Sequence, residues 1–306
     1  MVEFVVVGLN PCRQRTIRSG RVVLGEVHRA AEVREDASGK GANVARVLAQ
    51  NGETVALLGH AGGPLGAEFQ RSLEHDGIRL HVLDDRAPIR ACTTVVDDQQ
   101  HLTTEFVAPS PNVSPAANDE LFRVIGTYAD RRDAQVHLLI CGSAAGGYAQ
   151  TVFADLVRAG KQAGMTVYCD LAGAALNSVL PLVPDVVKVN LRELYEARFP
   201  SRSLAEQGDD AAAVDAVAST LHSLEQAGTL CVVTRGAKPT LWWRDGLQQA
   251  APPSIEPLNT IGSGDAFLAG LAAALAGGTP LDQAVERGHT MAALNAGLLR
   301  PGSVRP

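Results

Sequence analysis

The chain has 306 residues, of which 46% are hydrophobic, 20% are charged and only 4% are aromatic, so its core must consist of Ala, Val and Leu rather than stacked rings. This composition excludes a disordered chain, a disulfide-knotted mini-protein and a collagen-like repeat. A formal net charge of −6 argues against nucleic acid as a partner, because binding a phosphate backbone needs a basic face. A small anionic substrate needs only a few cations in one cleft, so it stays compatible with this charge.

Nothing in the sequence points to a membrane or to an oxidising compartment. No apolar run reaches the roughly 18–20 residues that a membrane-spanning helix needs, and the N-terminus carries Glu3 instead of a basic leader region. The five cysteines show no CxxC spacing and four lie in or beside apolar runs, which favours buried thiols over zinc or redox chemistry. We therefore expect a soluble, cytoplasmic protein with no membrane partner.

Short apolar runs alternate with longer helical patterns along most of the chain. Continuous apolar runs are typical of strands buried on both faces of a parallel sheet. The strand candidates are Phe4–Leu9, Val55–Gly59, Val136–Cys141, Thr166–Asp170, Val186–Asn190 and Leu230–Thr234. The helix candidates are Ala42–Gln50, Leu65–His75, Pro115–Asp130, Gln150–Ala163, Asp210–Gln226, Asp265–Ala276 and Leu281–Ala296. Repeated strand–helix–strand units predict a doubly wound α/β fold, a mainly parallel sheet flanked by helices, in one domain spanning residues 1–306.

Two segments, at about 12–36 and 88–107, interrupt this alternation with short strand patterns and polar turns. Val22–Leu24 is one of the expected strands, and Asp97–Gln100 has the composition of a hairpin tip. Neither segment has a helix of its own to cover it. We expect the two to form a small β-sheet lid outside the main sheet, whose exposed strands could also pair two copies into a homodimer.

The most informative stretch is Asn259–Phe267, in which Gly262, Ser263 and Gly264 precede Asp265 and a helical run. A glycine turn that opens a helix presents backbone N–H groups at the positive end of the helix dipole, where they can hold a transferring phosphoryl group. Asp265 could accept the proton of a substrate hydroxyl at that point. The alternative is structural: Asp265 would only cap the helix N-terminus.

A second glycine turn opens the helix near residue 40. Gly39 and Gly41 would let the backbone approach a ligand, while Lys40 adds charge and Asn43 can bond hydroxyls. A dinucleotide site is disfavoured because no apolar strand precedes these glycines. Gly63 belongs to a similar turn one unit later. The P-loop motif and the HRD and DFG elements of protein kinases are all absent from the sequence.

Several motifs, taken in order, resemble one family of enzymes. The matching blocks are Leu9–Pro11, Leu24–Arg29, Gly39–Ala45, Asp170–Leu176, Lys188–Leu194 and Asn259–Gly270. Together they make the chain similar to the phosphofructokinase B (ribokinase-like) sugar kinases, in the branch that contains 1-phosphofructokinase and tagatose-6-phosphate kinase. Each block alone is weak, whereas the ordered set runs nearly from end to end.

The resemblance implies transfer of the γ-phosphoryl group of ATP, with magnesium, to a hydroxyl of a sugar phosphate such as fructose-1-phosphate, fructose-6-phosphate or tagatose-6-phosphate. By similarity, Asp265 would be the base and the turn of Gly262, Ser263 and Gly264 the anion hole. The substrate-binding residues implied are Gln14, Arg29, Gly39, Lys40, Asn43, Gly63, Arg90 and Ser143. The nucleotide-binding residues implied are Lys188, Asn190, Glu193, Thr234, Gly236, Lys238, His289 and Ala293. Magnesium would be held through water and phosphate near Asn190 and Glu193, without a direct protein ligand.

Two departures from the family pattern leave the sugar open. Gln14 replaces the usual Asp that grips sugar hydroxyls, and the loop Gly142–Gly147 replaces the usual GSLPPG. A kinase for an unphosphorylated sugar or nucleoside on the same fold is one alternative, although a neutral acceptor needs no clamp of Arg29, Lys40 and Arg90. A non-catalytic sugar-phosphate sensor is another, and a dinucleotide-dependent dehydrogenase is the most distant.

Overall fold

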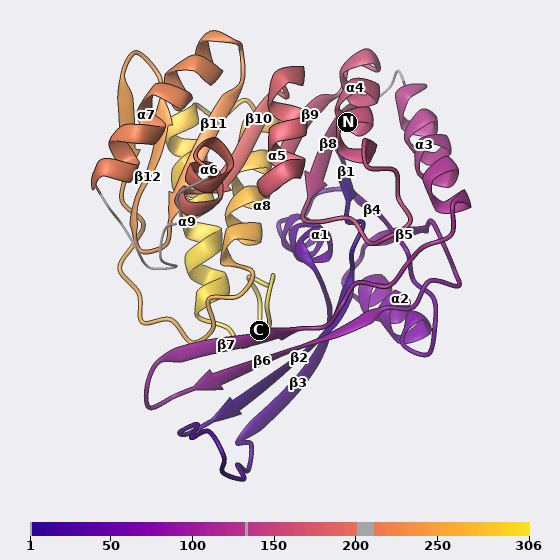
Figure 1. Cartoon of the computed structure of the whole chain (residues 1–306), viewed down its shortest axis with the longest axis vertical. Helices are drawn as coiled ribbons and strands as arrows, with labels where there is room; N and C mark the ends of the chain where they lie inside the picture. Colours follow the sequence, from indigo (N-terminus) through magenta and orange to yellow (C-terminus); the bar gives the residue numbers. More distant parts are fainter. Residues whose placement is uncertain (1, 132–133, 201–210) are drawn as a thin grey trace.

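The computed structural model describes residues 2–131, 134–200 and 211–306, and within them it contains two β-sheets (Figure 1). The larger sheet has nine strands in the order β13-β12-β11-β10-β9-β8-β1-β4-β5. Its pairs are parallel from β11 to β5, whereas β12 and β13 are antiparallel. Its strands are β1 Val2–Val7, β4 Val55–Gly59, β5 Arg79–Val82, β8 Gln135–Cys141, β9 Thr166–Asp170, β10 Val186–Asn190, β11 Leu230–Arg235, β12 Lys238–Trp243 and β13 Leu247–Ala250.

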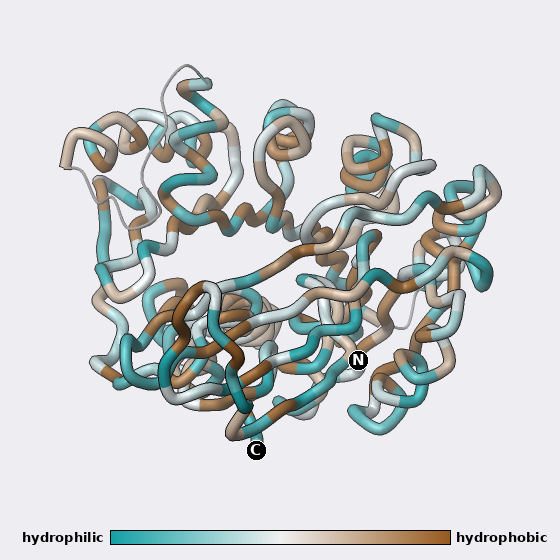
Figure 2. The backbone as a smooth tube through the Cα atoms, turned by 60° about the horizontal axis from the view of Figure 1, so that its bottom comes forward, coloured by the Kyte–Doolittle hydropathy of each residue, from teal (hydrophilic) through white to brown (hydrophobic). Residues whose placement is uncertain are grey.

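Helices cover both faces of the larger sheet, and each face has its own apolar core. One core packs α3 Ala116–Ala129, α4 Val152–Gln162, α5 Gly173–Val179, α6 Leu191–Arg198 and α7 Ala211–Gln226 against the sheet. The other packs α1 Lys40–Gln50, α2 Gly66–His75, α8 Ser263–Ala276 and α9 Leu281–Ala296. Figure 2 shows the hydrophobic strand segments enclosed between these helix layers. The expected doubly wound α/β architecture is confirmed.

The smaller sheet is the predicted lid. Its strands are β2 Cys12–Ser19, β3 Glu32–Ser38, β6 Arg90–Asp97 and β7 Leu102–Val107, in the order β3-β2-β6-β7. Figure 1 shows it as a separate layer beside the larger sheet and its helices. The predicted hairpin tip between β6 and β7 is held by Asp97, whose carboxylate accepts from the backbone N–H groups of Gln99 and Gln100 at 3.0 and 2.8 Å.

One expectation about the lid is wrong. Val22–Leu24 form no strand but belong to the loop between β2 and β3, because the Val22 N–H donates to Asp97 rather than to a neighbouring strand and Leu24 is 96% exposed. The strand that precedes Gly39 is β3, which is mostly polar, so the expectation that no apolar strand stands there is not contradicted. Strand β3 pairs antiparallel with β2 in the lid, so the parallel strand of a dinucleotide fold is still missing.

The helix predicted from Asp210 is described from Ala211, since Asp210 lies outside the described residues. Among the helices described, none combines the length and the apolar character required to span a bilayer. All five cysteines are buried thiols without disulfides. The short elements β5, β12, β13, α5 and α6 have no counterpart among the predicted elements.

Candidate active site

Two adjoining cavities lie between the lid and the larger sheet. The first has a volume of about 760 Å³ and is lined by Asp265 together with residues of the lid, of β10 and of α9. The second, of about 660 Å³, lies over the ends of β8 and β9 and the start of α1. Gly39, Lys40, Arg90 and Glu193 line both cavities. One ligand could therefore extend from either cavity toward the same few side chains.

The turn before α8 has the geometry that its glycines predict. Gly262 is the N-cap residue and adopts a left-handed backbone conformation, with φ 84°. Asp265 lies in the first turn of α8 rather than at its N-cap, so the purely structural capping alternative does not describe its position. The Ser263 N–H is bonded to the Thr260 carbonyl at 3.2 Å. That bond uses one of the three N–H groups expected to hold an anion, while Gly262, Gly264 and Asp265 all line the larger cavity.

Asp265 is 6% exposed and accepts a hydrogen bond of 2.8 Å from Nδ2 of Asn43. Burial raises the pKa of Asp265 to about 6, and the nearby carboxylate of Asp170 acts in the same direction, while Lys40 and the Asn43 bond oppose them. At neutral pH the group is therefore ionised and has a pKa suited to accepting a proton.

A buried aspartate near Asp265 joins two lysines. Asp170, the last residue of β9, is fully buried and accepts from Lys40 Nζ at 2.8 Å and from Lys188 Nζ at 3.1 Å. Burial opposes ionisation of Asp170, but Lys188 and Lys40 outweigh it and lower its pKa. Burial likewise lowers the pKa of Lys40, but Asp170, Glu193 and Asp265 outweigh it and raise the pKa above its usual value. Lys40 is therefore held as a cation beside the ionised Asp170.

Lys188 lies directly against the first turn of α8. A Cβ atom added to Gly264 would be only 2.9 Å from Lys188 Nζ, so the absence of a side chain at position 264 makes room for the ammonium group. The lysine charge and the N-terminal end of the helix dipole consequently act on the same region of the cavity.

Asn190 and Glu193 form a capping box at the start of α6. The Asn190 side chain accepts from the Glu193 N–H at 2.7 Å, and Glu193 Oε2 accepts from the Asn190 N–H at 2.9 Å. The other carboxylate oxygen of Glu193 is 3.5 Å from Lys40 Nζ. The motif that the resemblance assigns to magnesium thus also has a structural role, which the sequence analysis did not foresee.

The larger cavity continues away from Asp265 past most of the predicted nucleotide-binding residues. Thr234, Gly236, His289 and Ala293 line it, together with a loop at 252–257. His289 shares a hydrogen bond of 2.8 Å with the Thr240 hydroxyl, and burial lowers its pKa. Lys238, at the start of β12, is exposed and is not among the lining residues.

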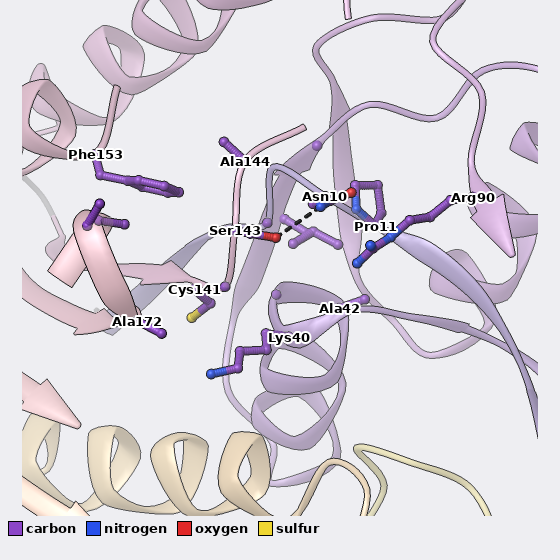
Figure 3. Close-up of a pocket in the computed structure, with 18 of the residues that line it drawn as sticks. Asn10, Pro11, Lys40, Ala42, Arg90, Cys141, Ser143, Ala144, Phe153 and Ala172 are labelled. Carbon is purple, nitrogen blue, oxygen red and sulfur yellow. Dashed lines mark hydrogen bonds between the residues drawn. The ribbon is translucent and has the colours of Figure 1, made fainter. Parts of the chain in front are cut away.

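The substrate-binding residues predicted from the lid occupy several positions. Arg90 lines both cavities and donates to the Ala108 carbonyl at 3.3 Å. Gln14 lines the larger cavity, but its Nε2 donates to the Thr94 hydroxyl at 2.7 Å. In the smaller cavity, Ser143 accepts from Asn10 Nδ2 at 2.9 Å, and Figure 3 draws this bond as a dashed line beside Pro11 and Arg90.

Two predicted substrate residues are not brought to either cavity. Arg29 is exposed in the loop between β2 and β3. Gly63, with φ 67°, packs against Pro88 next to the bridge between Gly62 and Pro88, so it supports the strand that carries Arg90. Asp170 is the opposite case: it lies at the site, but the sequence analysis gave it no role. Its signal was an acidic residue at the end of a buried parallel strand.

A buried carboxylate follows a glycine turn, near two lysines and an arginine that comes from a separate lid. This combination is typical of an enzyme that transfers a phosphoryl group to a hydroxyl. The family model for pfkB carbohydrate kinases matches residues 3–302. The chain belongs to the pfkB family of carbohydrate kinases, phosphotransferases that use ATP and an alcohol acceptor.

Solved structures agree with this fold. Phosphofructokinase-2 from Escherichia coli has a TM-score of 0.81 at 21% identity, over 97% of this chain and 94% of that one. A protein of Thermotoga maritima, named as a possible 1-phosphofructokinase, has a TM-score of 0.83 at 20% identity, over 97% and 93%. A phosphofructokinase-like protein of Staphylococcus aureus has a TM-score of 0.73 at 22% identity, over 98% and 92%. At these identities the likeness shows the fold.

Proposed function

We propose that this sugar kinase phosphorylates a hydroxyl of a sugar that already carries a phosphate, such as fructose-1-phosphate, fructose-6-phosphate or tagatose-6-phosphate. The observation that carries the proposal is Arg90, which lines both cavities from the lid side. Among the described residues its buried Nε has no hydrogen-bond partner. An unsatisfied buried guanidinium N–H is costly, and a phosphate oxygen of the substrate would satisfy it. A neutral sugar could offer only an uncharged hydroxyl or ring oxygen there, and such an acceptor bonds a guanidinium less strongly than a phosphate oxygen does.

In the proposed mechanism, Asp265 takes the proton of the acceptor hydroxyl as the hydroxyl oxygen attacks the γ-phosphorus of ATP. The bond between that phosphorus and the β,γ-bridging oxygen breaks, and ADP leaves with the bond's electron pair. Backbone N–H groups at the start of α8 and the ammonium of Lys188 face the charge on the transferred group. Positioning and charge stabilisation account for most of the rate, because phosphoryl transfer demands little covalent work from the protein.

The charges at the site favour a nucleotide that brings its own cation. Three cationic side chains, Lys40, Lys188 and Arg90, line the larger cavity, and Glu105, Glu193 and Asp265 balance them. Within the described residues, no group of three or more His, Cys, Asp or Glu side chains converges to hold a metal. Magnesium would be held near Asn190 and Glu193 through water and the nucleotide phosphates, and would neutralise phosphate charge there.

The direct test is an ADP-release screen over phosphorylated and free sugars, with and without magnesium. We expect turnover with at least one ketohexose phosphate, dependent on magnesium, and far less with free sugars or nucleosides. Asp265→Asn is the control, and it should abolish turnover while ATP binding stays measurable by calorimetry. A preference for a neutral acceptor, or a near-normal rate in Asp265→Asn, would refute the proposal. ATP binding without turnover on any acceptor would favour a sensor.

We also propose that two copies pair through the lid. Ile17 of β2 is aligned with Val33 of β3 and with Val95 of β6, so an apolar row crosses three strands. This face is opposite the one that carries Gln14 and Cys92 into the cavity, because neighbouring residues of a strand point to opposite faces. Val33 is 46% exposed and Phe106 of β7 is 62% exposed. A second copy of the same face is the occupant that would bury this row.

A further inference from the structure

A cluster of buried ions lies behind the candidate active site. Arg46 of α1 is fully buried, and its Nε donates to Asp76 Oδ2 at 2.6 Å. Arg300 donates to the same oxygen at 2.7 Å and is paired with Asp36 of β3 at 2.9 Å. The cluster therefore ties together the lid strand β3, helix α1, the end of α2 and the turn near the C-terminus. Its residues line neither cavity.

The remaining N–H groups of Arg46 reach backbone and one side chain. They donate to the Ala37 carbonyl, to the Pro301 carbonyl at 3.2 Å, to the Gly302 carbonyl at 3.5 Å and to Asn43 Oδ1 at 3.4 Å. The Ser38 hydroxyl also donates to Asn43 Oδ1, at 3.0 Å. Two donors therefore face the oxygen of this amide, which leaves its nitrogen to donate to Asp265.

The C-terminal turn touches both sides of the site. Gly302 has φ 60°, and a Cβ added to it would be 2.3 Å from Cβ of Asn43. A Cβ added to Gly262 would be 2.3 Å from the backbone nitrogen of Gly302. The C-terminal turn thus fits between Asn43, which donates to Asp265, and Gly262, the N-cap residue of α8. Both contacts involve the main chain or the stem of a side chain, so they leave no room for adjustment.

We propose that Arg46 and the C-terminal turn Arg300–Gly302 form a positioning unit for Asp265. The guanidinium of Arg46 orients the Asn43 amide so that the amide nitrogen donates to the Asp265 carboxylate. The turn holds Asn43 in place relative to Gly262. The role of Asp265 as the proton acceptor comes from the proposed function, on which this inference rests. Stability alone is a poor reason for a buried arginine, since apolar side chains in such places are often as stabilising. The planar guanidinium of Arg46 has five N–H donors, which lets it bond four acceptors besides Asp76, namely three backbone carbonyls and the Asn43 amide oxygen.

The first test compares two glycines with the same backbone requirement. Gly302 and Gly278 both have positive φ, at 60° and 76°, but an added Cβ meets nothing within 4 Å at Gly278. Gly302→Ala and Gly278→Ala thus share the backbone strain and differ in the contact with Asn43. We expect Gly302→Ala to lower kcat about 10²-fold, as small misplacements do, with the KM for ATP nearly unchanged. Equal kcat values in the two folded variants would overturn the proposal.

The second test measures Asp265 itself, by carbon-13 NMR titration of aspartate carboxyls, with Asp265→Asn to assign the signal. Arg46→Lys keeps the charge but cannot hold the amide oxygen and both turn carbonyls. The charged groups that face Asp265, namely Lys40 of α1, Asp170 of β9 and Lys188 of β10, remain in place. We expect its pKa to rise in Arg46→Lys and in Gly302→Ala, because the hydrogen bond from Asn43 is weakened.

A lower melting temperature with an unchanged Asp265 titration in both variants would reduce Arg46 to a structural role and overturn the proposal. The titration needs no substrate. If the chain turned over no acceptor at all, the proposed function would fail, whereas a raised Asp265 pKa would still support the positioning unit.

Discussion

At the scale of single residues, the carboxyl of Asp265 links the structure to a pH profile. Burial raises its pKa to about 6, and the group must be ionised to accept a proton. We therefore expect kcat/KM to be level above that pH and to fall about tenfold for each pH unit below it. The measurement is kcat/KM between pH 5 and 8 at constant ionic strength.

Phosphate groups of substrate and nucleotide also titrate near pH 6, so the binding of both must be measured over the same range. Asp265 controls the profile only if the fall persists after those binding changes are divided out. A profile flat down to pH 5 would mean that the carboxylate has an ordinary pKa or is not the base.

Arg90 should matter far more for one substrate than for the other. Arg90→Ala removes a guanidinium that lines both cavities, so we expect the KM for the sugar phosphate to rise by the equivalent of about 2–3 kcal/mol, with little change for ATP. Steady-state kinetics with each substrate varied in turn give the two values.

Arg13→Ala is the matched control for Arg90→Ala. Arg13 belongs to the same sheet, but it pairs with Glu35 at 2.9 Å and lines neither cavity. We expect its loss to leave both KM values unchanged. Equal increases for sugar phosphate and ATP in Arg90→Ala would contradict a clamp on the sugar's phosphate.

At the scale of elements, the start of α6 combines a helix cap with a charge at the site. Glu193→Gln keeps a side chain that can complete the capping box but removes the charge near Lys40. Glu193→Ala removes both. We expect the alanine variant to lose about 1 kcal/mol of unfolding free energy and the glutamine variant to lose almost none. Denaturant unfolding measures both values.

Activity then separates the two roles of this glutamate. If the charge acts on magnesium and the nucleotide, kcat/KM for Mg-ATP falls in both variants. If Glu193→Gln is as active as the unmodified chain, the acidic group serves only as a cap, and the assignment that the resemblance supplied is wrong.

The sequence predicted long, strongly patterned elements better than short, polar ones. Leu281–Ala296 has the predicted bounds because its apolar period is regular, whereas β5 and β13 were missed because they are only four residues long and half of those residues are polar. Val22–Leu24 misled because apolar residues favour a strand, although here they belong to an exposed loop. Whether a short segment forms a strand depends on which other segment lies beside it, and the local sequence pattern does not contain that information.

The same limit applied to the site. The glycine turns at residues 39 and 262 were predictable because each needs only a few neighbouring residues. Asp170 joins Lys40 to Lys188, and Asp76 joins Arg46 to Arg300. These pairings link segments up to 254 positions apart, so one sequence could not reveal them.

At the scale of the whole molecule, the lid face predicts an assembly. If two copies pair through Ile17, Val33 and Val95, a charge in the row should separate them, because a buried unpaired carboxylate is costly. We expect Val33→Glu to shift the particle from the mass of two chains to the mass of one, measured by light scattering after gel filtration.

The control for the dimer is an equally exposed apolar residue elsewhere. Leu294 of α9 is 46% exposed, as is Val33, so Leu294→Glu should leave the mass unchanged. A single-chain mass for the unmodified protein at micromolar concentration would argue against the pairing.

The two tryptophans of the chain, Trp242 and Trp243, are neighbours on β12 and face opposite sides of the larger sheet. Trp243 is in ring contact with His222 of α7. Trp242 packs in the other core, two residues beyond Thr240, which lines the larger cavity. Intrinsic tryptophan fluorescence therefore offers a label-free readout of the proposed nucleotide end of the larger cavity, away from the lid. Binding at that end can therefore be followed without a dye or a coupled assay.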